Sequence, residues 1–199
     1  RATSTQATPE RPLLSSNVMF MEDRMGHEVK VYPHNDLLNL SHHNLQTILD
    51  KEKLEASQGI GLDCMNLINS LAFSVESLIN FVGFKVIQDW KERSPFHIKI
   101  AALEEALGFR FDKDNEPYKT LIILKENRDK MAHGKPIIRI QDASSREALV
   151  EAMKSPWDDF INPEFAKHAY EQVKEFEILL MTLAKIDVFE TLTSGTAVY

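Results

Sequence analysis

The stretch from Asn127 to Gly134, which reads NRDKMAHG, holds the residues best suited to chemistry. Arg128 is followed directly by an acidic residue, Asp129, and a histidine, His133, stands five positions after the arginine. Arginine is a permanent cation that grips a phosphate with a fork of donors, and histidine gains or loses its proton near neutral pH. This pattern predicts a site that binds a phosphodiester and moves a proton.

The geometry of a helix restricts how the two side chains can cooperate. Residues five apart on an ideal helix differ by about 140° in direction and by about 7.5 Å along the axis. Arg128 and His133 therefore lie on different faces of their helix. Either a cleft between two subunits or a distorted last turn at Gly134 is needed to bring both to one phosphate. The lysines and arginine that form a basic patch around the motif are Lys125, Lys130, Lys135 and Arg139.

The chain as a whole has an ordinary globular composition, with 43% apolar and 27% charged residues over 199 positions. This length predicts one domain with a full hydrophobic core. A net charge of −7 argues against a general nucleic-acid coat, which needs many basic contacts, but leaves room for a local basic pocket. The single cysteine, Cys64, fits a reducing, cytoplasmic setting. No run of about 18 apolar residues occurs, so no membrane span is expected.

Hydrophobic spacing predicts an all-α protein, because apolar residues recur at steps of three and four along most of the chain. The predicted helices cover residues 35–55, 62–93, 96–107, 117–133, 146–154 and 163–189. Four or five of them are the principal helices of a bundle that spans residues 35–190. Residues 1–34 are expected to form an extended arm with one short strand at 28–32, and residues 191–199 a loose tail.

Turn and capping residues mark the ends of these elements. The predicted caps are Asn35 or Asp36 for the first helix, Gly108 after the third, Pro117 before the motif helix, and Asn162 with Pro163 before the last. The short segment 137–145 begins in a strand-like way and then becomes a loop.

The motif in this context resembles the HEPN superfamily, a set of small helical-bundle domains. Their mark is an arginine, four to six intervening residues and a histidine, often with Asn, Asp or His directly after the arginine. Arg128, Asp129 and His133 fit with four residues between. Residues 76–80 (ESLIN), on the long second helix, look like the acid-containing helix common in these domains, and the resemblance covers residues 40–188.

The resemblance implies a homodimer with the two motif helices near the interface, and for many members a metal-independent endoribonuclease without a cofactor. In these enzymes the ribose 2′-hydroxyl attacks the adjacent phosphorus and leaves 2′,3′-cyclic phosphate and 5′-hydroxyl ends. Carried over to this chain, His133 handles the proton or orients the 2′-hydroxyl, and Arg128 stabilises the charge on the phosphate. Asp129 orients one of these groups, and Glu76 braces Arg128.

The resemblance also assigns a wider set of residues and partners. Asn80 and Asn127 are expected to support the site, and the RNA-binding residues are expected to be Lys125, Lys130 and Lys135. An antitoxin or regulatory protein is an expected partner. Some members carry a tyrosine two residues after the histidine, which a nucleotidyltransferase antitoxin modifies, but Lys135 stands there in this chain, so silencing of that kind is not expected.

Structural roles compete with these assignments. Arg128 can instead serve only to pair with Glu126 or Glu76, and His133 can cap the last carbonyls of its helix. Glu76 either pairs with Arg128 or faces solvent. Three further patterns favour structure over chemistry. Four histidines and the cysteine match no metal-ligand spacing, namely His27, His34, His42, His43 and Cys64. Gly59-Ile60-Gly61 marks a helix break. Phe109-Arg110-Phe111 fits a loop anchored by two rings.

Two functions therefore remain open. The intact motif favours a cytoplasmic ribonuclease, such as a toxin or a stress or phage-defence effector. The acidic charge and the missing tyrosine favour a non-catalytic HEPN dimer that binds nucleotide, RNA or a protein partner.

Overall fold

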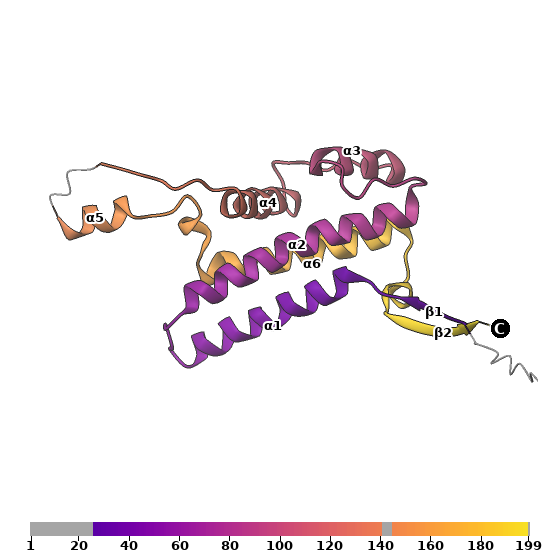
Figure 1. Ribbon diagram of the computed structural model, residues 1–199, viewed down its shortest axis with the longest axis horizontal. Coiled ribbons are helices and arrows are strands. Elements are labelled where there is room, and N and C mark those ends of the chain that lie inside the picture. Colours follow the sequence, from indigo (N-terminus) through magenta and orange to yellow (C-terminus); the bar gives the residue numbers. More distant parts are fainter. Residues whose placement is uncertain (1–25, 141–144, 199) are drawn as a thin grey trace, which may run out of the picture. The chain divides into compact units, whose positions relative to one another are not determined.

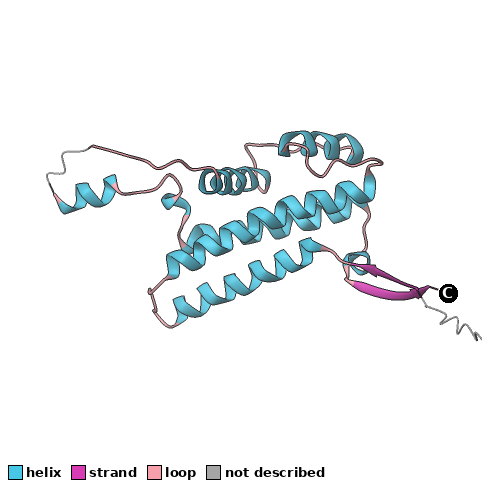
Figure 2. Ribbon diagram, in the orientation of Figure 1, coloured by secondary structure: helices cyan, strands magenta, loops and turns pink. Residues whose placement is uncertain are grey.

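The computed structural model describes residues 26–140 and 145–198, and this part of the chain is mostly helical (Figures 1 and 2). It contains six α-helices: α1 Pro33–Lys53, α2 Ile60–Val86, α3 Phe96–Leu107, α4 Tyr118–Ala132, α5 Arg146–Ala152 and α6 Pro163–Ala184. Two 3-10 turns, Asp158–Phe160 and Val188–Thr191, flank α6. Most of the predicted arm, residues 1–25, lies outside the described residues, as do 141–144 and Tyr199.

The chain divides into two compact units, one of residues 30–194 and one that joins the two chain ends. In the second unit, strand β1, Gly26–Lys30, pairs with strand β2, Ser194–Val198, in a two-stranded sheet. The short N-terminal strand was predicted two residues later, at 28–32. The structure has β2 where the sequence predicted a loose tail, because pairing with a distant segment cannot be seen in local spacing.

Helix α2 is the centre of the helical unit and contacts α1, α3, α4 and α6. In Figure 1, α1 lies on one side of α2, and α3 and α4 lie on the other. The fully buried residues that α2 gives to the core include Leu67, Leu71, Leu78 and Val82. Such a wide apolar surface is what the sequence predicted for a helix contacted from several sides.

By length and composition, helix α2 is also long and apolar enough to cross a membrane, and it is the only described helix of which this is true. No membrane span was expected from the sequence. The most apolar stretch of α2 has a mean hydropathy of 1.4, and 67% of that stretch is buried inside the protein. The core helix of a soluble protein has the same properties, so this observation is weak support for a membrane location.

The end of α2 differs from the prediction, which carried the helix to Arg93. The helix stops at Val86, because Ile87 is extended and Asp89 has a φ of 59°. The chain then folds Trp90 back against α2, where a Cβ on Gly83 would lie 2.4 Å from the indole. A contact between residues seven apart decides this turn, and the local propensity of 87–93 does not reveal it.

Several predicted caps are confirmed and one is wrong. Gly108 has a φ of 69° after α3, and the Asn162 side chain accepts a hydrogen bond from the Phe165 amide (2.8 Å) at the start of α6. Neither Asn35 nor Asp36 caps α1. The helix begins earlier, because Pro33 occupies its first turn, a position that proline favours, and Asn35 donates to the Thr191 carbonyl instead.

The remaining boundaries agree within a few residues. Pro117 directly precedes α4, as predicted, and α6 ends at Ala184, not 189, because Lys185 adopts a left-handed conformation with a φ of 54°. The strand-like stretch after the motif forms no strand over its described residues, 137–140.

Candidate functional site

Glu76 lies at the centre of the site, on the face of α2 that meets α3 and α4. Its Oε2 accepts a hydrogen bond from Arg128 Nη2 at 2.8 Å, so the predicted pair is confirmed. Its Oε1 accepts from Lys99 Nζ, also at 2.8 Å. One carboxylate therefore joins α4 to α3 through two cations.

No role was predicted for Lys99 from the sequence, although only 1% of its side chain is exposed in the structure. Its ammonium also donates to Asn80 Oδ1 (3.1 Å) and to the Glu92 carbonyl (2.9 Å), so all three of its protons are used. A buried charge must be paired and hydrogen-bonded in this way. The sequence does carry a signal, because Lys99 falls on the apolar stripe of α3 beside Ile100 and Leu103.

Asn80, which was predicted to support the site, bonds to Lys99 and not to Arg128. Its Oδ1 accepts from Lys99 and from Trp90 Nε1 (3.3 Å), so it ties the chain after α2 to the same network. Asn127 does not join the network. Its side chain is 1% exposed, and neither amide atom has a hydrogen-bond partner among the described residues.

Arg128 is held on three sides. Its guanidinium carbon lies 5.6 Å from the centre of the Phe73 ring, a cation–π distance, and Phe73 is 48% exposed. Its Nε lies 3.3 Å from Asp129 Oδ1, too poorly aligned for a hydrogen bond. The side chain is only 22% exposed, so Glu76 and the ring fix its position.

Asp129 forms an ion pair with Lys125 at the edge of the network, with 2.8 Å between Asp129 Oδ2 and Lys125 Nζ. Partial burial raises the pKa of Asp129. The hydrogen bond from Lys125 and the charges of Arg128, Lys125 and His133 outweigh that effect, so its pKa lies below the ordinary value. The three cations of the network, Lys99, Lys125 and Arg128, face two carboxylates, Glu76 and Asp129. The exposed Glu126 borders the same cavity and offsets the remaining positive charge.

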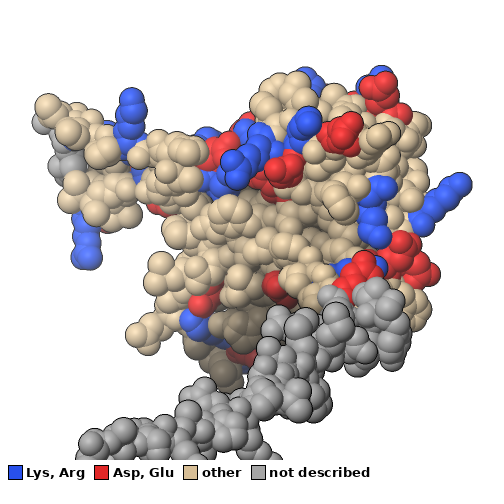
Figure 3. All heavy atoms as spheres, turned by 45° about the vertical axis from the view of Figure 1, so that its right-hand side comes forward, with Lys and Arg blue, Asp and Glu red and all other residues tan. Residues whose placement is uncertain are grey.

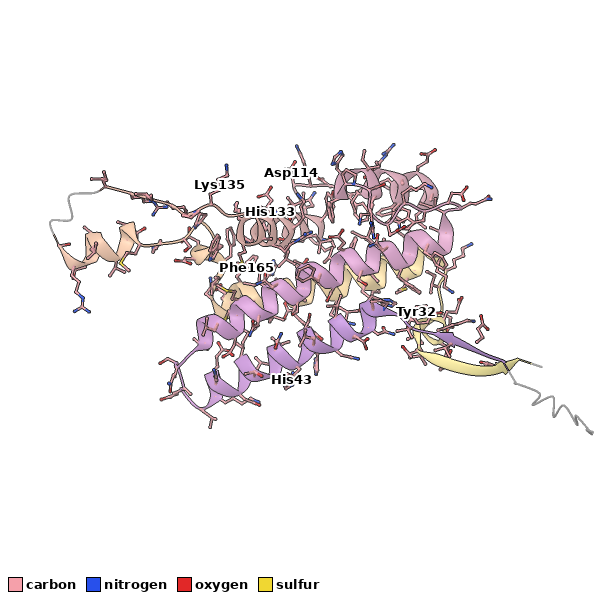
Figure 4. All side chains as sticks on the ribbon, in the orientation of Figure 1. Tyr32, His43, Asp114, His133, Lys135 and Phe165 are labelled. Atoms are coloured by element: carbon pink, nitrogen blue, oxygen red, sulfur yellow. The ribbon has the colours of Figure 1, made fainter. Side chains whose placement is uncertain are left out.

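His133 lies in a different environment. It is the exposed cap at the end of α4, and its amide donates to the Asp129 carbonyl at 2.9 Å, as in a regular helix. Figure 4 shows it with Lys135 where α4 passes into the following segment. It borders a cavity of about 310 Å³ whose other lining residues include Lys130, Lys135 and Trp157.

Within one chain, Arg128 and His133 border different cavities, although the charges of both lower the pKa of Asp129 between them. Arg128 lines a separate cavity of about 480 Å³, and of the motif residues only Asp129 borders both. Because the last turn of α4 is regular, a distortion at Gly134 does not bring the two side chains together. Gly134 is needed for another reason, since a Cβ there would lie 2.6 Å from the Lys130 carbonyl oxygen.

The residues of the predicted basic patch lie in different surroundings. Lys125 pairs with Asp129, and Lys130 and Lys135 are exposed beside His133. Arg139 donates to the carbonyls of Ala152 and Lys154, close to α5. On the face of the molecule drawn in Figure 3, blue and red side chains are mixed and no uniformly basic surface is visible.

The other patterns have structural roles. His34 is buried against Phe81, with ring centroids 4.2 Å apart, and burial lowers its pKa, while His42 Nδ1 lies 3.1 Å from the Tyr170 hydroxyl. No cluster of three His, Cys, Asp or Glu residues that could hold a metal ion occurs in the described part of the chain, and the His27 side chain lies outside it. Gly59 precedes α2 with a φ of 72°, the predicted helix break.

The Phe109-Arg110-Phe111 segment is the ring-anchored loop that the sequence predicted. The two phenylalanine rings meet edge to face at 4.3 Å, and both pack against the core. The exposed Arg110 pairs with Glu104 at 2.9 Å.

Comparison of the chain with protein-family models, curated proteins and solved structures found no match.

Proposed function

We propose that this protein is a metal-independent endoribonuclease of the HEPN type that acts as a cytoplasmic homodimer. The observation that supports this best is the fixed position of Arg128, held at 2.8 Å by Glu76 and placed over the Phe73 ring. A positioned cation that needs no reorganisation is what stabilises a phosphate as its charge grows in the transition state.

The reaction that these residues suit is transfer of the phosphoryl group within the RNA. The 2′-oxygen forms a bond to phosphorus and loses its proton to the imidazole of His133, and the bond from phosphorus to the 5′-oxygen breaks. The 5′-oxygen leaves with a proton from solvent or from an acid across the cleft. Arg128 binds the non-bridging oxygens, and Asp129 helps to hold Arg128. The exposed Phe73 under Arg128 offers a flat surface for a neighbouring base.

A dimer is part of this proposal because of the arrangement of α4. Arg128 and His133 line different cavities of one chain, and the last turn of the helix is regular. In a two-fold dimer, Arg128 of one subunit can face His133 of the other, which forms two equal composite sites. Exposed Lys130 and Lys135, beside His133, would then contact the RNA backbone.

The test uses single-stranded RNA in excess EDTA with wild type, Arg128→Ala and His133→Ala. We expect wild type to produce 2′,3′-cyclic phosphate ends and each variant to lose most of this activity. Lys119→Ala, an exposed position on the same helix, is the matched control and should cleave normally. Cleavage that survives in both motif variants would show that the site is wrong.

A second function is favoured by one observation, the engagement of Arg128 by two carboxylates. In that case the network is structural, and the protein is a non-catalytic HEPN dimer that binds nucleotide, RNA or a regulatory partner such as an antitoxin. Absence of cleavage by wild type on several RNAs, together with dimerisation, would favour this alternative.

A further inference from the structure

The cavity beside Arg128 continues along α4 as a groove, which we call the α4 groove. One wall is a stripe of α4 that includes Tyr118, Ile122, Lys125 and Asp129, spaced by four, three and four residues and therefore on one face of the helix. The opposite wall is the start of α3, at Phe96. The volume of about 480 Å³ and the mixture of rings with a few charged groups are typical of a ligand site.

The two ends of the groove differ in chemistry. At one end the rings of Phe96 and Tyr118 are nearly parallel, with an interplanar angle of 9° and centroids 6.5 Å apart. Phe111 stacks behind Tyr118, with ring centroids 5.0 Å apart, so the rings are fixed in place and only partly covered. An aromatic surface that is rigid and accessible suits a nucleobase, because every base has a π-face.

At the other end the groove carries the charged network. Lys125 and Arg128 border it, with Glu76 and Asp129 as their partners, and the exposed Glu126 lies on the same wall. The carboxylate of Glu126 repels a phosphate and can accept hydrogen bonds from the amino groups of a base. A phosphate is therefore favoured only close to Arg128 and Lys125, the two partly exposed cations at this end.

The length of the groove sets the size of the ligand. Tyr118 and Arg128 are ten residues apart on one helix, which is about 15 Å along its axis. A ligand that contacts both ends fits a single strand of more than one nucleotide better than it fits a mononucleotide.

We infer that the α4 groove binds the bases of single-stranded RNA beside the phosphate at Arg128, with one base stacked against Phe96 and Tyr118. This inference rests on the proposed function, because that function places a phosphate at Arg128. The groove would then select single-stranded over double-stranded RNA, since a base must leave its stack to reach the rings.

Binding can be measured without cleavage by using 2′-O-methyl oligoribonucleotides, which lack the attacking hydroxyl. Fluorescence anisotropy of short homopolymers should show binding to wild type, and a duplex of the same length should bind more weakly. Phe96→Leu and Tyr118→Leu each remove one of the two rings of the groove. Each should weaken binding by roughly fivefold or more, the loss expected for one stacked base.

The matched control is Phe84→Leu, because Phe84 is 74% exposed on α2 and does not line the groove. It should bind as wild type does, and thermal melting should show that all variants are folded. The inference is overturned if wild type binds none of the homopolymers, or if folded Phe96→Leu and Tyr118→Leu both bind as wild type does.

The outcomes separate this inference from the proposed function. If wild type binds single strands through the groove but never cleaves RNA, the groove stands and the nuclease proposal fails. If wild type cleaves in a manner dependent on Arg128 while both groove variants cleave and bind normally, the nuclease stands and the groove inference fails.

Discussion

The two ends of the NRDKMAHG motif are held in different ways. Arg128 is fixed by Glu76 and the Phe73 ring, both on α2, and Glu76 is held in turn by the buried Lys99 of α3. His133 is exposed, and only its backbone is held, at the end of α4. Tertiary packing thus fixes the position of the arginine side chain, whereas the histidine side chain is exposed to solvent.

The largest expected effect comes from mixing Arg128→Ala with His133→Ala. If each site takes its arginine from one subunit and its histidine from the other, a mixed dimer contains one intact site. Equal amounts of two inactive variants should then recover about a quarter of wild-type cleavage, because half of the dimers are mixed and each has one of two sites. A cleavage assay after refolding the variants together measures this.

The control is the doubly substituted protein mixed in equal amount with Lys119→Ala. Their mixed dimers contain no complete site, so cleavage should fall to about half that of the same amount of Lys119→Ala alone. If the two single variants recover nothing although mixed dimers are shown to form, the ends of the motif act within one chain.

The second prediction tests how firmly the arginine end is held. Lys99→Met leaves Glu76 with one cation and removes a partner from Asn80 and from the Glu92 carbonyl. Loss of one member of a buried pair costs about 3–5 kcal/mol, and partial exposure of Glu76 reduces this to about 2–3 kcal/mol. Urea unfolding measures the change, and the exposed Lys119→Met should change stability little. Equal effects of the two substitutions would contradict the network.

The third prediction disturbs the histidine end alone. Gly134→Ala places a Cβ 2.6 Å from the Lys130 carbonyl oxygen, so the chain after α4 must shift. We expect a loss of about 1–2 kcal/mol of stability and a larger loss of cleavage than of RNA binding, because Arg128 is untouched. Gly61→Ala is the control, since a Cβ there meets Ile161 at an ordinary 3.8 Å. Normal cleavage by Gly134→Ala would show that the position of His133 does not matter.

The smallest expected effect concerns Asp129, which lies between the two ends. Its pKa is lowered in the folded protein, so the unfolded chain binds the proton more readily in acid. Its stabilising effect is present above the ordinary value of 3.8 and is lost as the pH falls through the folded-state pKa. Asp129→Asn should lower the unfolding free energy by a few tenths of a kcal/mol near neutral pH, and the difference should shrink below about pH 4.

The control is Asp114→Asn at an exposed position, whose unfolding free energy is measured over the same pH range. A difference between wild type and Asp129→Asn that stays constant down to strongly acidic pH would mean that the carboxylate is not held in its charged form by Lys125 and Arg128.

The sequence by itself determined most of the helical architecture. Steps of three and four placed the helices, and Gly108, Asn162 and Pro163 marked their ends, because capping and periodicity depend on residues close together in the chain. The pair between Glu76 and Arg128 was also predictable, because a charge on a helix with so wide an apolar face needs a partner.

Only the tertiary structure decided the rest. It placed Lys99 behind Glu76, folded Trp90 back onto Gly83 and paired β1 with β2, all of which are contacts between residues that local propensity does not connect. It also separated Arg128 from His133 into two cavities by keeping the last turn of α4 regular. The sequence singled out Arg128 and His133 as the candidate reactive side chains, and the packing of α2, α3 and α4 decided that one is fixed and the other exposed.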